Sequence, residues 1–340
     1  MPIEKPRYFR IQDVPETTEL AERIMLPWST LNFNLSGLVL NRVTLLISGT
    51  NNGKSCFANS IVCNTIKQGY KVFLFAGEDG ADEARDNIYR QYLTFDKSNF
   101  DKVDYYQNGK RTNTFEYRLK HEKFKEVERV FEDNLFIYNN EFPATQKELI
   151  SCLEESYQAE GWRLAVIDNC EMFDLSDNVS ENKSMKDICI ALRQFAISHK
   201  VHLFIVCHIR KTERGIIRPD IFDTKGTSAL TNISKNILSI IRLDTVDHTS
   251  KEYKSLGRAM EASGYNIDEC DGVCEVLKTK GVKNGLVGLK FNKISGTYYE
   301  APRIKGFTDS ENSTSYAKPD VQTNGNIWDN LKEDSEDLPF

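Results

Sequence analysis

The segment SGTNNGKS, residues 48–55, constrains the fold of this chain more than any other part of its sequence. An apolar run precedes it and a helical pattern follows it, and this order of strand, glycine-rich loop and helix is the context of a phosphate-binding loop. Glycines permit the tight turn, while backbone N–H groups and the helix N-terminus bind phosphate oxygens. We therefore predict a phosphate-binding loop made of Ser48, Gly49, Thr50, Asn51, Asn52, Gly53, Lys54 and Ser55, although the generic pattern has glycine where this chain has Ser48.

Apolar runs typical of buried strands alternate with helical patterns along most of the chain. The expected strands are residues 43–48, 71–76, 135–139, 163–168, 201–208, 237–243 and 274–280, and the expected helices are residues 17–25, 54–68, 81–92 and 114–131. Near-continuous apolar strands that alternate with helices indicate an α/β fold. We expect a mostly parallel central sheet covered by helices on both faces.

Charge and composition divide the 340 residues into a body and a tail. Eight acidic residues and two lysines follow residue 308, so this last segment carries the whole net charge of −6 and leaves the body neutral. We expect an arm at residues 1–30, an α/β domain at 31–305 and a disordered acidic tail at 306–340. No run of 18 apolar residues and no signal peptide pattern occur, which predicts a soluble, cytoplasmic protein.

The eight cysteines are scattered, mostly in apolar runs, as expected for reduced thiols. Cys270 and Cys274 form a lone C-x3-C pair, which supplies too few ligands for a tetrahedral zinc site. We expect no zinc ion there.

Polar side chains at strand ends are the candidates for chemistry beside the phosphate-binding loop. Asp168 ends an apolar strand, where a carboxylate can hold Mg²⁺ together with the hydroxyl of Ser55. Glu78 follows the second strand and would lie next to the loop if these two strands are neighbours, within reach of a water that attacks the terminal phosphate. His208 ends another strand and could bind that phosphate, although a histidine at a strand end is more often structural.

A basic segment follows His208. Arg210, Lys211, Arg214 and Arg218 lie in a polar stretch that also contains Gly215 and Pro219. Such a segment suits contacts with the phosphates of a DNA strand, and a solvated charged loop is the alternative.

The motifs SGTNNGKS, KVFLFAGEDG, RLAVIDN, FIVCHIRK, DTKGTSALTNISKNILSIIRL and VLKTK occur in the order found in DnaB-like hexameric helicases. Residues 30–300 resemble above all the helicase half of phage primase-helicases and mitochondrial Twinkle. The resemblance implies a RecA-like core that hydrolyses ATP or another nucleotide with Mg²⁺. It also implies a ring of six or seven chains that moves 5′ to 3′ on single-stranded DNA and unwinds duplexes.

The resemblance also assigns residues farther along the chain. Arg242 and Phe291 match the pair that holds the nucleotide base, and a core aromatic is the alternative for Phe291. Lys278 and Lys280 match a lysine and an arginine that reach into the neighbouring subunit's site. Lysine in place of that arginine keeps the charge but loses the bidentate geometry.

Two departures from the pattern matter. Only about 30 residues precede the predicted ATPase, so we expect priming to come from another protein. An insertion at residues 244–272 is weakly helical, and its purpose does not follow from the sequence.

The chain ends in EDSEDLPF, where Leu338, Pro339 and Phe340 follow a cluster of acids. This end resembles the phenylalanine-terminated acidic tips of single-strand-binding proteins and phage helicases. It predicts binding to a basic pocket of a replication protein such as a polymerase or primase, whereas a solubilising tail is the alternative. Two other functions compete with the helicase: a RecA-like recombination ATPase, and a nucleotide-binding helicase loader or adaptor.

Overall fold

The computed structural model describes residues 10–11, 21–93, 96–107, 110–142, 145–173, 181–209, 218–224, 228–305 and 307. By internal contacts the chain divides into two units, Met1–Ile304 and Lys305–Phe340. The basic residues Arg210, Lys211 and Arg214 lie outside the described residues. So do Leu338, Pro339 and Phe340.

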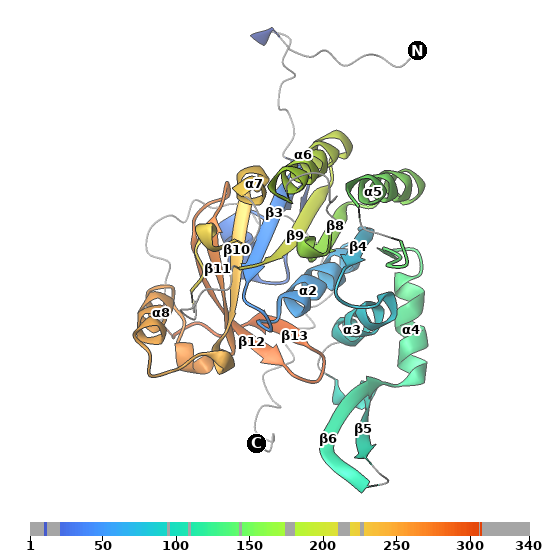
Figure 1. Ribbon diagram of the computed structural model, residues 1–340. Helices are drawn as coiled ribbons and strands as arrows, with labels where there is room; N and C mark the ends of the chain where they lie inside the picture. The colour runs from blue at the N-terminus through green and yellow to red at the C-terminus, as the bar shows by residue number, and fades with distance from the viewer. Residues whose placement is uncertain are drawn as a thin grey trace. The chain divides into compact units, whose positions relative to one another are not determined.

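A nine-stranded sheet forms the centre of the first unit, in the order β13-β12-β11-β10-β3-β9-β8-β4-β7 (Figure 1). Its strands are β3 (Val43–Ser48), β4 (Val72–Ala76), β7 (Leu135–Ile137), β8 (Leu164–Asp168), β9 (His202–His208), β10 (Asn236–Arg242), β11 (Gly272–Lys278), β12 (Gly285–Asn292) and β13 (Thr297–Glu300). The six strands from β10 to β7 are parallel, and β11, β12 and β13 extend the sheet in antiparallel fashion. The predicted mostly parallel sheet is therefore confirmed.

Helices cover both faces of this sheet. They are α1 (Ser29–Leu35), α2 (Lys54–Lys67), α3 (Ala81–Leu93), α4 (His121–Phe131), α5 (Gln146–Glu160), α6 (Glu181–His199), α7 (Ser228–Ile233) and α8 (Lys251–Ala262). One core cluster joins α1, α2, α3, α4 and α8 to the sheet, and a second joins α5, α6 and α7 to its other face (Figure 1). Successive residues of β3 alternate between the clusters, with Leu45 and Ile47 in one and Leu46 in the other. Burial on both faces explains why these strands are apolar throughout.

Two sequence predictions of helices are wrong in part. Residues 110–119, expected to be helical from 114 onward, form β6 (Lys110–Leu119), which pairs with β5 (Phe100–Gln107) in a separate two-stranded sheet. Aromatic and apolar residues at 115, 117 and 119 have the two-residue period of a strand, which outweighs the helical charge spacing.

The second wrong prediction concerns the start of the chain. The expected helix at 17–25 is replaced at its end by β1 (Arg23–Ile24), which pairs with β2 (Leu38–Val39). Ile24, Leu26 and Trp28 are buried in the first core cluster, and the Trp28 ring stacks on Phe57 of α2 with 4.1 Å between ring centroids. The residues before α1 thus pack directly beneath the helix that follows the phosphate-binding loop.

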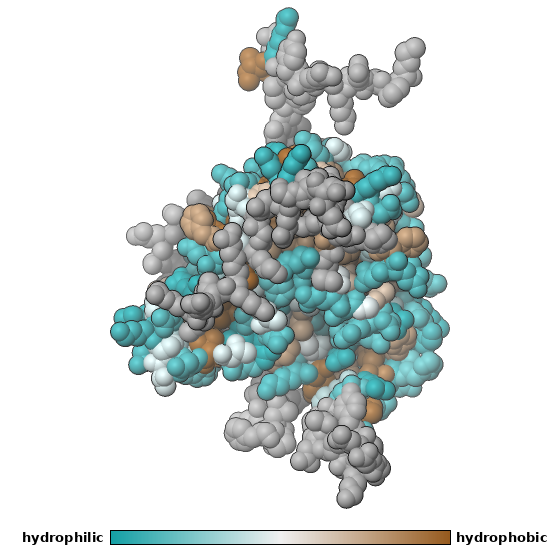
Figure 2. All heavy atoms as spheres, in the orientation of Figure 1, coloured by the Kyte–Doolittle hydropathy of each residue, from teal (hydrophilic) through white to brown (hydrophobic). Residues whose placement is uncertain are grey.

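The visible face of the molecule is mostly hydrophilic, with small apolar patches (Figure 2). No helix within the described ranges is long and apolar enough to cross a membrane. The insertion at 244–272 forms α8, whose Tyr253, Leu256 and Met260 are buried in the first core cluster. The insertion therefore covers part of that face of the sheet.

Candidate active site

The phosphate-binding loop connects the end of β3 to the start of α2. Asn51 and Gly53 have positive φ angles of 60° and 75°, so the backbone makes the tight turn that the sequence predicts. A side chain on Gly53 would also meet the hydroxyl of Tyr298, because a Cβ there would lie 2.2 Å from that oxygen. Gly53 is thus required both by its backbone conformation and by the close approach of β13.

The neighbouring strand β10 holds the loop at two points. Ser48 is fully buried, and its hydroxyl donates to the carbonyl oxygen of Ile240 in β10. This bond uses the side chain that replaces glycine in the generic pattern. Arg242, at the end of β10, donates to the carbonyl oxygen of Asn51 at 3.3 Å and forms an ion pair with Asp244. The guanidinium therefore lies at the edge of the loop.

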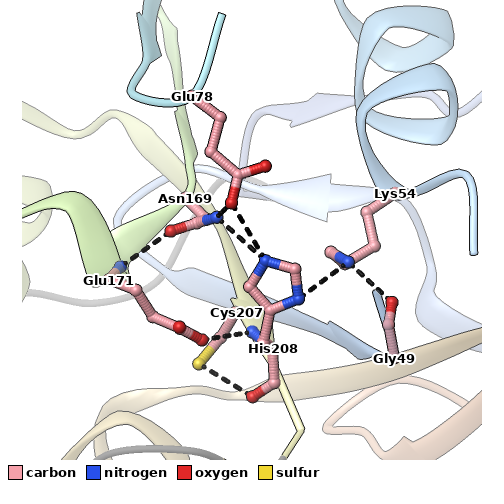
Figure 3. Close-up of polar contacts among 7 residues, drawn as sticks. All are labelled: Gly49, Lys54, Glu78, Asn169, Glu171, Cys207 and His208. Carbon is pink, nitrogen blue, oxygen red and sulfur yellow. Dashed lines mark hydrogen bonds and ion pairs between the residues drawn. The ribbon is translucent and has the colours of Figure 1, made fainter. Parts of the chain in front are cut away.

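Glu78 reaches the site across two intervening strands. The sequence placed it beside the loop on the condition that β3 and β4 are neighbours, and this condition is wrong, because β9 and β8 lie between them. The strands are parallel, so their carboxyl ends share one edge of the sheet, and Glu78 follows β4 at that edge. Its carboxylate Oε1 lies 3.1 Å from Nε2 of His208, the last residue of β9 (Figure 3).

A hydrogen-bond network connects Lys54, His208, Asn169 and Glu78 (Figure 3). Lys54 Nζ donates to Gly49 O at 2.7 Å and lies 3.1 Å from His208 Nδ1. An ammonium can only donate, so Nδ1 is the acceptor in this contact, and the other ring nitrogen, Nε2, lies 3.1 Å from both Glu78 Oε1 and Asn169 Nδ2. Asn169 Nδ2 donates to the same Glu78 oxygen at 2.5 Å. One carboxylate oxygen of Glu78 thus contacts both Asn169 and His208.

Glu171 fixes the end of β9. Its Oε1 accepts from the backbone N–H of His208 at 2.9 Å, and its own N–H donates to Asn169 Oδ1 at 3.0 Å (Figure 3). The short turn Cys170–Met172 after β8 is therefore tied to the point where the basic segment begins.

The electrostatics of these groups reflect their burial. Burial lowers the pKa of the Lys54 ammonium, although Asp168, Glu78 and Glu171 oppose this shift. Burial also raises the pKa of Asp168, against the hydrogen bond from Ser55 and the charge of Lys54. Burial alone would raise the pKa of Glu78, but hydrogen bonds from His208 and Asn169 bring it below its usual value.

The residues predicted to hold Mg²⁺ lie together. Ser55, Asp168, Glu78 and Asp79 line a small cavity of about 10 Å³, room for roughly one water-sized group. A hydroxyl and carboxylates are the oxygen ligands that Mg²⁺ prefers, and a positive ion would offset the burial of the Asp168 charge. The donor set therefore fits the metal, with Ser55 and Asp168 as the residues that would hold it.

Lys278 and Lys280 lie away from this edge. Lys278 pairs in register with Ile237, at the start of β10, whereas the phosphate-binding loop follows the ends of the parallel strands β3 and β9. The backbone N–H of Lys280 donates to Asn236 Oδ1, one residue earlier still. Neither lysine lies beside Lys54 of its own chain.

Two other predicted residues have partners within the chain. Arg218 forms a bidentate ion pair with Glu275 of β11, at 2.8 and 2.6 Å, which occupies the guanidinium proposed for DNA phosphates. Phe291 packs against Tyr298 with 4.8 Å between ring centroids, beside the loop but partly within the core.

Three residues of the site were missed by the sequence analysis. Asn169 and Glu171 follow Asp168 directly, so their place beside a predicted metal ligand was a usable signal. Tyr298 could not be found in this way, because β12 and β13 were not predicted and nothing in the local pattern connects it to Gly53.

Comparison with known families gives a match that extends over more than half of the chain. The family model described as AAA domain matches residues 10–214, which contain Lys54, Glu78, Asp168 and His208. The chain belongs to the AAA domain family. No curated protein matches this AAA domain chain in sequence.

Solved structures share the fold of this AAA domain protein. One is a DnaB-like replicative helicase, determined with its interactions with primase, which is 16% identical with a TM-score of 0.63. It aligns with 82% of this chain, which spans 63% of the helicase's length, less than two thirds. Another is an ATPase domain, also 16% identical with a TM-score of 0.63, over 84% of this chain and 94% of that domain. The fold is thus that of RecA-like helicase ATPase domains.

Proposed function

We propose that this protein is a ring-forming DNA helicase that hydrolyses ATP or a related nucleotide at subunit interfaces and moves 5′ to 3′ on single-stranded DNA. The observation that carries the proposal is the convergence of Lys54, Ser55, Glu78, Asp168 and His208 at one edge of the sheet. The structural similarity to a DnaB-like replicative helicase also supports a helicase function.

Each side chain has a part in the proposed hydrolysis. Lys54 leaves His208 Nδ1 and Gly49 O to bind the outer phosphates. Glu78, oriented by Asn169 and His208, accepts a proton from the attacking water. Ser55 and Asp168 would hold Mg²⁺, which neutralises phosphate charge when bound. Arg242 and Phe291 would flank the nucleotide base.

His208 links nucleotide to DNA in this proposal. It touches Lys54 on one side, and its backbone leads within two residues to Arg210. Loss of the terminal phosphate would change the contacts of the His208 ring, and the basic segment would follow. Arg210, Lys211 and Arg214 are the proposed DNA contacts, with Arg218 anchored to Glu275.

The distance of Lys278 and Lys280 from the phosphate-binding loop of their own chain supports a role across a subunit interface, as in a ring, rather than within one chain. They lie toward the opposite ends of the strands that carry the phosphate-binding loop, so they suit contact with a neighbour's nucleotide. An adaptor would have no need of the hydrolytic set Lys54, Glu78 and Asp168, and this argues against the loader alternative. The recombination ATPase remains the second candidate, since it would share the same core.

We assign the regions 1–30, 31–305 and 306–340 as arm, ATPase and tail, with Ile24, Leu26 and Trp28 of the arm packed into the core of the ATPase region. The tail, ending in Leu338, Pro339 and Phe340, is the proposed contact for a replication partner such as a polymerase or primase. The similar DnaB-like helicase interacts with primase.

Unwinding of a forked DNA with a 5′ single-stranded arm tests the proposal. Replacing Arg210, Lys211 and Arg214 by alanine should abolish unwinding and DNA-stimulated hydrolysis but spare basal hydrolysis. Each lost phosphate contact should also flatten the salt dependence of DNA binding by about 0.7 in slope. Lys123→Ala with Lys125→Ala on α4 is the control for charge alone. Strand exchange without unwinding would instead favour the recombination ATPase.

A further inference from the structure

The segment that carries Glu78, residues 77–80, joins β4 to α3 and has little to fix its backbone from within. Gly77 precedes Glu78 and Gly80 ends the segment, and glycine has more backbone freedom than any other residue. Glu78, Asp79 and Asp168 also line one small cavity, so their carboxylates repel one another there. The position of Glu78 therefore depends on contacts from outside its own segment.

The end of β8 holds this segment on one side. The backbone N–H of Gly77 donates to the carbonyl oxygen of Asp168 at 2.6 Å, and Asn169 Nδ2 donates to the Glu78 carboxylate (Figure 3). Neither of these two bonds holds the backbone that follows Glu78. The other side of the segment faces β7, because β4 lies between β8 and β7 in the sheet.

Asn140, three residues beyond the end of β7, holds the segment on this second side. Its Nδ2 donates to the carbonyl oxygen of Ala76 at 2.7 Å and to that of Asp79 at 3.1 Å. Both partners are acceptors, and the amide nitrogen has two hydrogens, so one side chain can make both bonds at once. Asn140 thus holds the backbone two residues before Glu78 and one residue after it.

The backbone around Asn140 is itself held in a turn. The N–H of Phe142 donates to Asn139 O at 3.1 Å, and the N–H of Glu141 donates to Asn139 Oδ1 at 3.1 Å. Asn140 is exposed, so its side chain is not needed to fill the core. Its contribution lies in its two bonds to the segment that carries Glu78.

We propose that Asn140 is a positioning residue for nucleotide hydrolysis, which keeps the Glu78 carboxylate within reach of the attacking water. The proposal rests on the proposed function, in which Glu78 accepts the proton of that water. A small displacement of a base slows the chemical step steeply, whereas the phosphate-binding loop binds the nucleotide independently of Asn140. Loss of Asn140 should therefore lower the rate of hydrolysis and leave nucleotide affinity unchanged.

A double-mutant cycle between Asn140 and Glu78 tests this on the full-length chain with Mg²⁺ and radiolabelled ATP. Asn140→Ala should lower the turnover at saturating ATP by on the order of tenfold and leave the affinity for a fluorescent ATP analogue within about twofold of wild type. In the Glu78→Gln background the same change should lower the turnover by less than about twofold, because Asn140 acts through the Glu78 carboxylate. Asn140→Asp should lose at least as much turnover as Asn140→Ala, because it sets a carboxylate against two carbonyl oxygens.

Glu141→Ala is the matched control, because Glu141 lies in the same turn and its carboxylate contacts Asn139 Nδ2. It should hydrolyse ATP at the wild-type rate. Wild-type turnover by Asn140→Ala, weaker nucleotide binding in place of slower turnover, or equal losses in both backgrounds would overturn the proposal. Absence of hydrolysis by the wild type, or wild-type turnover by Glu78→Gln, would instead refute the proposed function.

Discussion

Glu78 is the residue on which the proposed hydrolysis depends most directly. Glu78→Gln keeps the shape that Asn169 and His208 hold but cannot accept a proton. We expect nucleotide affinity to stay within a few-fold of wild type while the hydrolysis rate falls about 100-fold or more. Phosphate release and nucleotide binding measured on the same preparation check this.

Glu83→Gln is the matched control, because Glu83 is an exposed acid in the first turn of α3. It should hydrolyse nucleotide at the wild-type rate. Wild-type turnover by Glu78→Gln would mean that another group activates the water.

His202 makes stability depend on pH. It is fully buried, with ring nitrogens 2.8 Å from Val39 O and 3.0 Å from Thr44 Oγ1, and burial lowers its pKa to about 4. The unfolded chain therefore binds this proton more readily than the folded one. The contribution of neutral His202 is fully present above about pH 6.5 and is lost as pH falls toward 4, on the order of 3 kcal/mol in total.

Urea unfolding at pH 7, 6, 5 and 4.5 measures this dependence. His202→Gln should be less stable than wild type at pH 7 but should lose less of its free energy of unfolding between pH 7 and 4.5. Parallel curves for the two proteins would assign the acid sensitivity to other groups.

At the scale of elements, the sequence predicts those strands that are apolar on both faces. β3, β4, β8, β9 and β10 are of this kind, because each is buried between two helical layers. The strand order is not predictable in the same way, since it depends on packing between distant segments. The assumed adjacency of β3 and β4 failed for this reason, and Glu78 still reaches the site because all parallel strands end at one edge.

The ion pair between Arg218 and Glu275 connects the end of the basic segment to β11, which carries Lys278. The Glu275 side chain is only 11% exposed, so Arg218→Ala leaves a buried charge without its partner. We expect about 1–3 kcal/mol lower stability and a larger loss of DNA-stimulated than of basal hydrolysis.

The double variant Arg218→Met with Glu275→Leu should recover most of the stability, because both polar groups are removed together. It should not recover the DNA-stimulated rate if the ion pair positions the basic segment. Thermal unfolding and hydrolysis with and without oligo-dT give the two readouts. Recovery of both would make the pair purely structural.

At the scale of the whole molecule, one chain does not bring all predicted residues to one place. Lys54 and Glu78 lie at one edge of the sheet, whereas Lys280 lies toward the other. The sequence indicates the residues of the nucleotide edge and the lysines at 278 and 280. It does not indicate that they lie apart, because this depends on β11 running antiparallel to β10. This separation suits a head-to-tail ring, because each interface would then join the edge of one chain that carries Lys54 and Glu78 to the part of the next chain that carries Lys280.

Mixing two inactive variants tests this arrangement. A Lys54→Ala chain cannot hydrolyse nucleotide at its own site but still offers Lys280 to its neighbour. A Lys280→Ala chain keeps Lys54 at its own site but offers no lysine at position 280 to its neighbour. In random rings formed at equal ratio, about a quarter of the interfaces combine an intact Lys54 with an intact Lys280. DNA-stimulated hydrolysis should therefore reappear, with a maximum near equal mixing. Lys123→Ala in place of Lys280→Ala is the control and should give activity that declines steadily as Lys54→Ala is added. If every mixture of Lys54→Ala and Lys280→Ala stays inactive while mixed rings are seen by native mass spectrometry, Lys280 does not act on its neighbour's nucleotide.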